Sequence, residues 1–156
     1  MARLLILLFS HGAMLAIGFG AGVYFLPILT APPSPDEAML EENAALAVYT
    51  VELSRDAPGN DALHWGEGTL SVAADRIVHE GRLAPGPDYR VYLVNGDVGH
   101  EDDFEPLKSS SLEVGAVKSF NGFIVDLPAD TNIEAYTTVL VWCEAFGEYI
   151  TAGRYR

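Results

Sequence analysis

The segment TTVLVWCEAFGEYITA, residues 137 to 152, has the composition of two β-strands separated by a short break. β-Branched and aromatic residues, which are enriched in strands, fill both arms of the segment. The break falls at Gly147, a residue type that tolerates the backbone angles of tight turns. The segment therefore predicts strands over 137–146 and 149–155, with Cys143 in the first of them.

Cys143 is the only cysteine in the sequence, so it cannot close an intrachain disulfide. It is a buried small residue, an intermolecular partner or a reactive group. Alternation along a strand places it on a small, apolar face with Val139, Val141 and Ala145. The opposite face carries Leu140, Trp142, Glu144 and Phe146. We expect Cys143 to point toward a core, where burial and nearby negative charge raise the pKa of a thiol.

The pattern continues through most of the chain. Short β-branched and aromatic runs alternate with glycine, proline and aspartate, and no helical period persists. The pattern predicts an all-β fold, a small antiparallel sandwich or barrel of about eight strands. The other expected strands span 46–53, 62–72, 76–80, 89–94, 115–120 and 122–127. Turns are expected at 84–88 and 127–132, where proline and glycine set the backbone angles.

An uncharged segment precedes this region. Residues 4–29 contain no charged side chain and are long enough, at 1.5 Å per residue, to cross a hydrocarbon core of roughly 30 Å. The run exceeds the apolar region of a cleaved signal peptide, so we interpret it as a signal anchor that spans the lipid bilayer. The chain then divides into an anchor (1–30), a proline-rich acidic stalk (31–45) and an exported β domain (46–156).

The distribution of charge predicts the orientation of the anchor. Arg3 precedes the apolar segment, whereas all 22 acidic residues follow Ala31. The positive-inside bias places the N-terminus in the cytoplasm and the C-terminal domain outside the cytoplasmic (inner) membrane, in the periplasmic or extracytoplasmic space. The chain has a formal net charge of −13, and it lacks the clustered basic residues that bind phosphate backbones. We therefore exclude nucleic acid as a partner.

Small residues in the anchor suggest a contact between two copies. Gly18 and Gly22 form a G-x-x-x-G pair, which lets two helices approach closely, and this predicts a weak homodimer. His11 is ionisable but lies near the cytoplasmic end, where we interpret it as structural. The acidic segment 95–105 lacks the spacing of a calcium loop, and we expect a solvated loop with no metal site.

Four separated motifs resemble one known family. HWGEG (64–68), GRLAPGPDYRVYL (81–93), VKSFNGFIVDLPAD (117–130) and VLVWCEAFGEYITA (139–152) are similar in order and spacing to the DM-thirteen (DM13) electron-transfer domain. In animals this domain accompanies DOMON domains, and in bacteria it also follows a single membrane anchor. The resemblance covers about residues 47–156. It implies a β-rich domain with a possible redox role.

The resemblance also implies which residues carry that role. The family's cysteine after a tryptophan matches Cys143, as a redox thiol or as the ligand of a prosthetic group such as haem. The family's histidine ahead of a glycine matches His64, a candidate neighbour of the thiol. The sequence has no C-x-x-C-H motif, so any haem would be held without covalent attachment.

Two functions remain open at this stage. In the first, a membrane-anchored extracytoplasmic domain has a cysteine-centred redox or electron-transfer role and exchanges electrons with another envelope protein. In the second, the domain is a non-catalytic envelope module for binding or structure, and Cys143 only packs the core.

Overall fold

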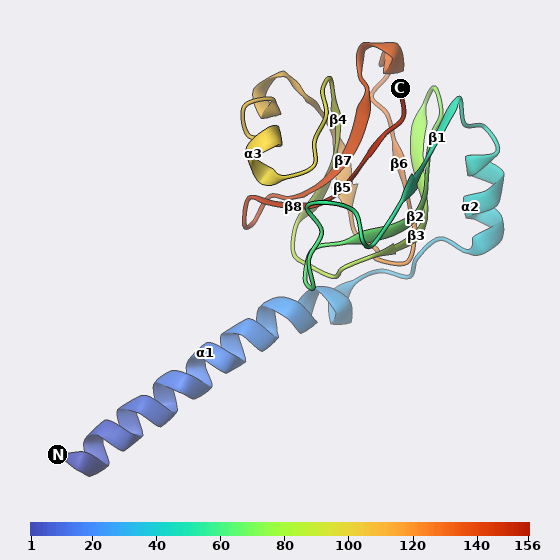
Figure 1. Ribbon diagram of the computed structural model, residues 1–156. Coiled ribbons are helices and arrows are strands. Elements are labelled where there is room, and N and C mark those ends of the chain that lie inside the picture. The colour runs from blue at the N-terminus through green and yellow to red at the C-terminus, as the bar shows by residue number, and fades with distance from the viewer.

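The computed structural model describes residues 1–156 as one long N-terminal helix followed by a β-sandwich (Figure 1). The helices are α1 (Ala2–Thr30), α2 (Glu37–Ala44) and α3 (Glu101–Phe104). The strands are β1 (Tyr49–Leu53), β2 (Gly66–Val72), β3 (Arg76–Leu83), β4 (Tyr89–Val94), β5 (Leu112–Val117), β6 (Phe123–Asp126), β7 (Thr138–Cys143) and β8 (Glu148–Arg154). Short 3-10 turns occupy Lys108–Ser110 and Ile133–Ala135.

The eight strands form two four-stranded sheets. One has the order β1-β2-β3-β6 and the other the order β5-β4-β7-β8, and every neighbouring pair is antiparallel. The chain crosses between the sheets after β3, β5 and β6, so residues far apart in sequence face one another across the core. These findings confirm the predicted all-β fold and identify it as a sandwich.

Apolar residues on the inner faces of both sheets form the main core. Val139, Val141 and Cys143 of β7 all belong to it. They pack with side chains such as Leu70 of β2 and Ile150 of β8, neither of which is exposed to solvent. The expected direction of Cys143 toward a core is confirmed.

The sheet that contains Cys143 is also covered on its outer face. Leu140 and Trp142, which alternate with the inward residues of β7, pack under Phe104 of α3. The rings of Phe104 and Trp142 lie 4.9 Å apart between centroids in an edge-to-face arrangement that suits aromatic pairs. β7 is consequently buried on both faces, and this holds the backbone of Cys143 in place.

The connection before the sandwich, expected to be a proline-rich acidic stalk, contains helix α2. Asp36 caps α2 by accepting a hydrogen bond from the backbone N–H of Met39, at 2.8 Å. Leu40 is buried, and its side chain lies beside Gly122, next to the start of β6. Arg76 of β3 donates a hydrogen bond to Asn43. The domain boundary expected at Leu46 stays a prediction, but α2 is attached to the first sheet.

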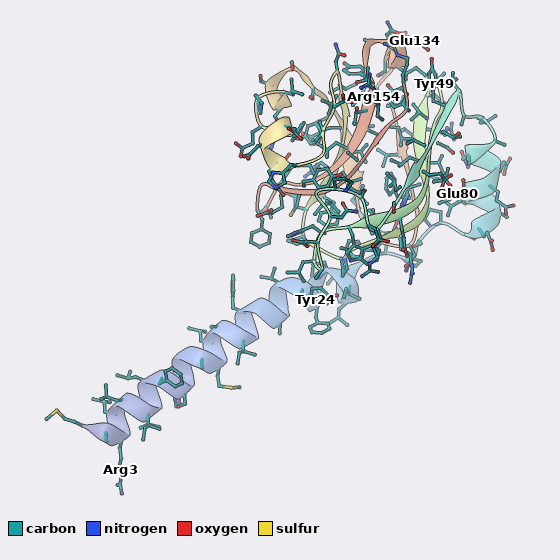
Figure 2. All side chains as sticks on the ribbon, viewed as in Figure 1. Arg3, Tyr24, Tyr49, Glu80, Glu134 and Arg154 are labelled. Carbon is teal, nitrogen blue, oxygen red and sulfur yellow. The ribbon has the colours of Figure 1, made fainter.

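Helix α1 extends away from the sandwich, and only its C-terminal end reaches it (Figure 1). It is the one helix that is long and apolar enough to cross a membrane, and no residue of it is fully buried. Figure 2 shows Tyr24 where α1 meets the sandwich and Arg3 at the opposite end of the helix. The contact between α1 and the sandwich lies at the end where β7 finishes and β4 begins.

Candidate functional site

Cys143 is the last residue of β7, at the end of the sandwich that faces α1. It lies directly opposite Tyr89, the first residue of β4, and opposite Glu148, the first residue of β8. Only 2% of Cys143 is exposed to solvent. The position therefore combines an inward side chain with the edge of the core.

Two turns surround the sulfur atom. The first contains Pro87, whose carbonyl oxygen accepts a hydrogen bond from the Cys143 thiol at 3.1 Å. The next residue, Asp88, has a positive φ of 49°, and its carbonyl oxygen accepts a 3.0 Å hydrogen bond from the backbone N–H of Glu144. The glycine-proline-aspartate turn is thus fastened to the end of β7 and presents a carbonyl group to the sulfur.

The second turn follows the cysteine. Gly147, with φ of 69°, donates its backbone N–H to the carbonyl oxygen of Cys143 at 2.9 Å, which folds residues 144–147 back on the strand. The backbone N–H groups of Phe146 and Ala145 in this turn lower the pKa of the Cys143 thiol. Backbone N–H groups in this arrangement stabilise a thiolate.

The thiol is neutral in this environment. Burial raises the pKa of Cys143 above its usual value, and the negative charges of Asp88 and Glu148 raise it further. Hydrogen bonding by the N–H groups of Phe146 and Ala145 lowers that pKa but does not reverse the shift. The site therefore holds an S–H group at neutral pH, beside backbone N–H groups that favour its anion.

The sulfur borders a cavity of about 380 Å³ between the end of the sandwich and α1. Most of the lining is apolar, and it comes from α1 and from three loops of the sandwich. The lining residues are Gly20, Val23, Tyr24, Leu63, His64, Pro85, Gly86, Pro87, Tyr89, Cys143, Phe146 and Ile150. Cys143 is therefore a core residue that also faces a space large enough for a small ligand.

His64 lines the same cavity, so the structure brings the two residues singled out from the sequence to one site. Its Nδ1 lies 3.2 Å from a carboxylate oxygen of Asp61, and Asp61 also accepts the backbone N–H of His64 at 2.7 Å. These contacts hold the ring at the cavity wall. No hydrogen bond joins His64 to the Cys143 thiol, whose polar partner is the carbonyl oxygen of Pro87.

Tyr89 is a further residue of this site, to which the sequence motifs assign no role. It is only 2% exposed, yet its hydroxyl group makes no hydrogen bond to the protein. The oxygen lies beside Gly86, where an added Cβ atom would be 2.4 Å away. Burial, together with the neighbouring Cys143 and Tyr24, raises the pKa of Tyr89, so the hydroxyl stays protonated and can donate. The sequence feature that could have identified Tyr89 is its alternation with Val91 and Leu93 along the predicted strand 89–94, which places all three side chains on the same face.

A second buried titratable residue, His79, lies apart from the cavity. It is fully buried on the inner face of β3, with its ring centroid 5.1 Å from that of Phe123. Its Nε2 is 3.1 Å from the carbonyl oxygen of Glu67, whereas Nδ1 is buried without a partner. Burial lowers the pKa of His79 to about 4, against the smaller opposing effect of the hydrogen bond to Glu67. This histidine contributes to the pH dependence of folding rather than to the cavity.

The residues around Cys143 do not fit a haem group. A cysteine ligates haem iron as a thiolate, so binding would have to release the proton that burial and the nearby carboxylates hold on this thiol. The cavity lining also contains no lysine or arginine to neutralise the haem propionates. No group of three or more histidine, cysteine, aspartate or glutamate side chains is arranged to share a metal ion.

Comparison with known proteins identifies the family of this domain. The family model described as "Electron transfer DM13" matches residues 59–155, which is more than half of the chain. The chain belongs to the electron transfer DM13 family. The matched region contains His64, Tyr89 and Cys143, and it omits α1 and α2. No curated protein and no solved structure matches this DM13 chain.

Proposed function

We propose that this DM13 protein is a membrane-anchored redox protein of the cell envelope, with Cys143 as its reacting group. The observation that carries the proposal is the position of the sulfur, which belongs to the core but also faces a cavity. A cysteine that only fills space needs no such access. Membership of an electron-transfer family supports the same role.

The proposal includes the topology of the chain. We place the N-terminus in the cytoplasm, α1 across the membrane and the sandwich outside, because Arg3 precedes the helix and all acidic residues follow it. The long helix supports a single span. The electron donor or acceptor is then a molecule of the envelope or of the membrane itself.

The surroundings of the sulfur support both protonation states of the thiol. In the resting protein the S–H group donates to the carbonyl oxygen of Pro87. When Cys143 reacts, its proton leaves, and the N–H groups of Phe146 and Ala145 stabilise the developing negative charge. We propose His64 as the residue that receives the proton, because it is the only histidine or acidic residue in the lining.

Reversible oxidation of the folded protein tests the redox role. Hydrogen peroxide, a small neutral oxidant, should convert Cys143–SH to Cys143–SOH with release of one water molecule. Dimedone traps this sulfenic acid, and mass spectrometry locates the adduct. In a parallel sample without dimedone, dithiothreitol reduces the sulfenic acid back to the thiol with release of water. Modification should occur without urea and be absent in Cys143→Ser. In His64→Ala the reaction should slow at neutral pH, while the urea midpoint of folding stays unchanged.

A second function rests on the burial of the same residue. Cys143 is 2% exposed and packs with 16 other residues of a 17-residue core. A non-catalytic envelope module would need no more than this packing. It predicts that peroxide modifies Cys143 only after unfolding, and that Cys143→Ser changes stability alone.

A further inference from the structure

The cavity beside Cys143 has the features of a ligand site rather than of a packing defect. Tyr89 is 2% exposed and its hydroxyl has no protein partner. The hydroxyl oxygen is not among the fully buried unpartnered atoms, so it reaches the open space and remains free to donate a hydrogen bond to a molecule there. The hydroxyl borders the cavity, on the side where Gly86 leaves room for it.

The lining defines the chemistry of that molecule. Leu63, Phe146 and Ile150 form apolar walls, and neither lysine nor arginine is present to bind an anion. The protonated Tyr89 hydroxyl offers one hydrogen-bond donor, which suits a carbonyl oxygen. The ligand that fits is an uncharged ring compound with a carbonyl acceptor.

A second apolar space shows how such a molecule reaches the cavity. A groove of about 410 Å³ along α1 shares Val23, Pro87 and Phe146 with the cavity. It continues down the helix to Phe19 and is lined almost entirely by apolar surface. The groove suits a hydrocarbon tail that extends from a ring in the cavity.

The length of α1 places this groove at the membrane surface. Its 29 residues rise about 44 Å at 1.5 Å per residue, whereas a hydrocarbon core is about 30 Å thick. With Arg3 at the cytoplasmic boundary, about nine residues of the helix, starting near Gly22, extend beyond the core. Tyr24 then lies at the interface, where tyrosine is enriched. A lipid-dissolved molecule can enter the groove without crossing water.

We propose that the cavity binds a quinone-type molecule from the membrane, with its carbonyl oxygen hydrogen-bonded to Tyr89 and its tail in the groove along α1. The inference rests on the proposed function, because a bound ring would lie beside the Cys143 thiol. It concerns binding alone, and it assigns no electron-transfer step to the complex.

The experiment measures binding of decylubiquinone to the full chain in phosphatidylcholine nanodiscs, followed by tryptophan fluorescence. The fully substituted ring has no free carbon for a thiol to attack. Decylbenzene, with a similar tail but no carbonyl group, is the control ligand. Tyr89→Phe removes the unpartnered hydroxyl alone. Tyr155→Phe is the matched variant, because Tyr155 donates to the carbonyl oxygen of Ile133 at 2.7 Å, outside the cavity.

We expect saturable binding of decylubiquinone that weakens about fivefold to tenfold in Tyr89→Phe, the effect of one hydrogen bond. Tyr155→Phe should bind as the wild type does, and decylbenzene should bind wild type and Tyr89→Phe equally. Equal affinity of Tyr89→Phe and wild type for decylubiquinone, or no saturable binding, overturns the proposal. Cys143→Ser should still bind decylubiquinone. A wild type that binds decylubiquinone but is not modified by peroxide without urea would reject the redox role alone.

Discussion

The buried imidazole of His79 should make folding of the sandwich sensitive to mild acid. The unfolded chain binds a proton at histidine near pH 6.5, whereas burial lowers the pKa of His79 in the folded protein to about 4. Its Nδ1 has no partner, so protonation would create a buried donor without an acceptor. Stability contributed by the neutral ring is complete above pH 6.5 and is lost as the pH falls toward 4.

The size of the loss follows from the shift. Each unit of pKa corresponds to about 1.4 kcal/mol, so the free energy of unfolding should fall by about 2 kcal/mol between pH 7 and pH 5, and by about 3 kcal/mol in total. Below pH 4 the folded state also binds the proton, and this contribution levels off. Carboxylates add their own pH dependence, so the difference from a variant isolates His79.

Urea unfolding of the full chain in nonionic detergent, followed by tryptophan fluorescence, measures this difference. Both tryptophans, Trp65 and Trp142, lie in the sandwich region. His79→Leu should lose about 2 kcal/mol less than wild type between pH 7 and pH 5. His100→Leu is the control and should behave as wild type, because the side chain of His100 is 59% exposed. Equal losses in wild type and His79→Leu would refute the reasoning.

Three further predictions concern the rest of the chain. Protease added outside the cytoplasmic membrane should digest residues 31–156, and a fusion after Arg156 to a reporter active only in the cytoplasm should be inactive; an active reporter contradicts the topology. Leu40→Ala should lower the free energy of unfolding by about 2 kcal/mol in urea titrations, because this side chain of α2 is buried against the first sheet; an unchanged midpoint contradicts that packing. Gly18→Ile with Gly22→Ile should abolish crosslinking of two copies in membranes, since both glycines are uncovered in the single chain; unchanged crosslinking contradicts the expected dimer.

Local sequence patterns predicted a strand most accurately where its residues are apolar on both faces, or where apolar and polar residues alternate regularly along it. The strand predicted at 89–94 matches β4, and β6 and β8 lie within one or two residues of the predictions. Strand β5 spans Leu112–Val117, so its predicted range of 115–120 was shifted by three residues toward the C-terminus. Its predicted end is used elsewhere, because the carbonyl oxygen of Phe120 accepts the backbone N–H of Leu83 at 2.9 Å. A contact across 37 residues leaves no local signal.

The candidate site was only partly predictable for the same reason. Parity placed Cys143 toward the core, and the resemblance to the DM13 family identified His64. The cavity depends on how α1 and three separate loops meet, which no single segment encodes. The missing partner of the Tyr89 hydroxyl is likewise a property of its surroundings. Sequence patterns could therefore identify the thiol but not the space beside it.

The most direct test of the redox account is whether Cys143 reacts without unfolding of the protein. Methyl methanethiosulfonate is small and uncharged, so it can reach the thiol through the cavity. If reaction requires global unfolding, its rate follows the unfolded population. A loss of about 2 kcal/mol in Leu40→Ala would then accelerate the reaction about thirtyfold. Leu40 packs on the first sheet, whereas Cys143 ends a strand of the second sheet. The substitution therefore changes the stability of the fold without altering the lining of the cavity.

The measurement compares the rate of modification of Cys143 in wild type and Leu40→Ala, without denaturant, from pH 7 to pH 10. The account predicts equal rates in the two proteins. It also predicts a rate that still rises above pH 9, because burial raises the pKa of this thiol. A thirtyfold faster reaction in Leu40→Ala would show that the sulfur is reached only by unfolding, and would contradict a redox role for Cys143.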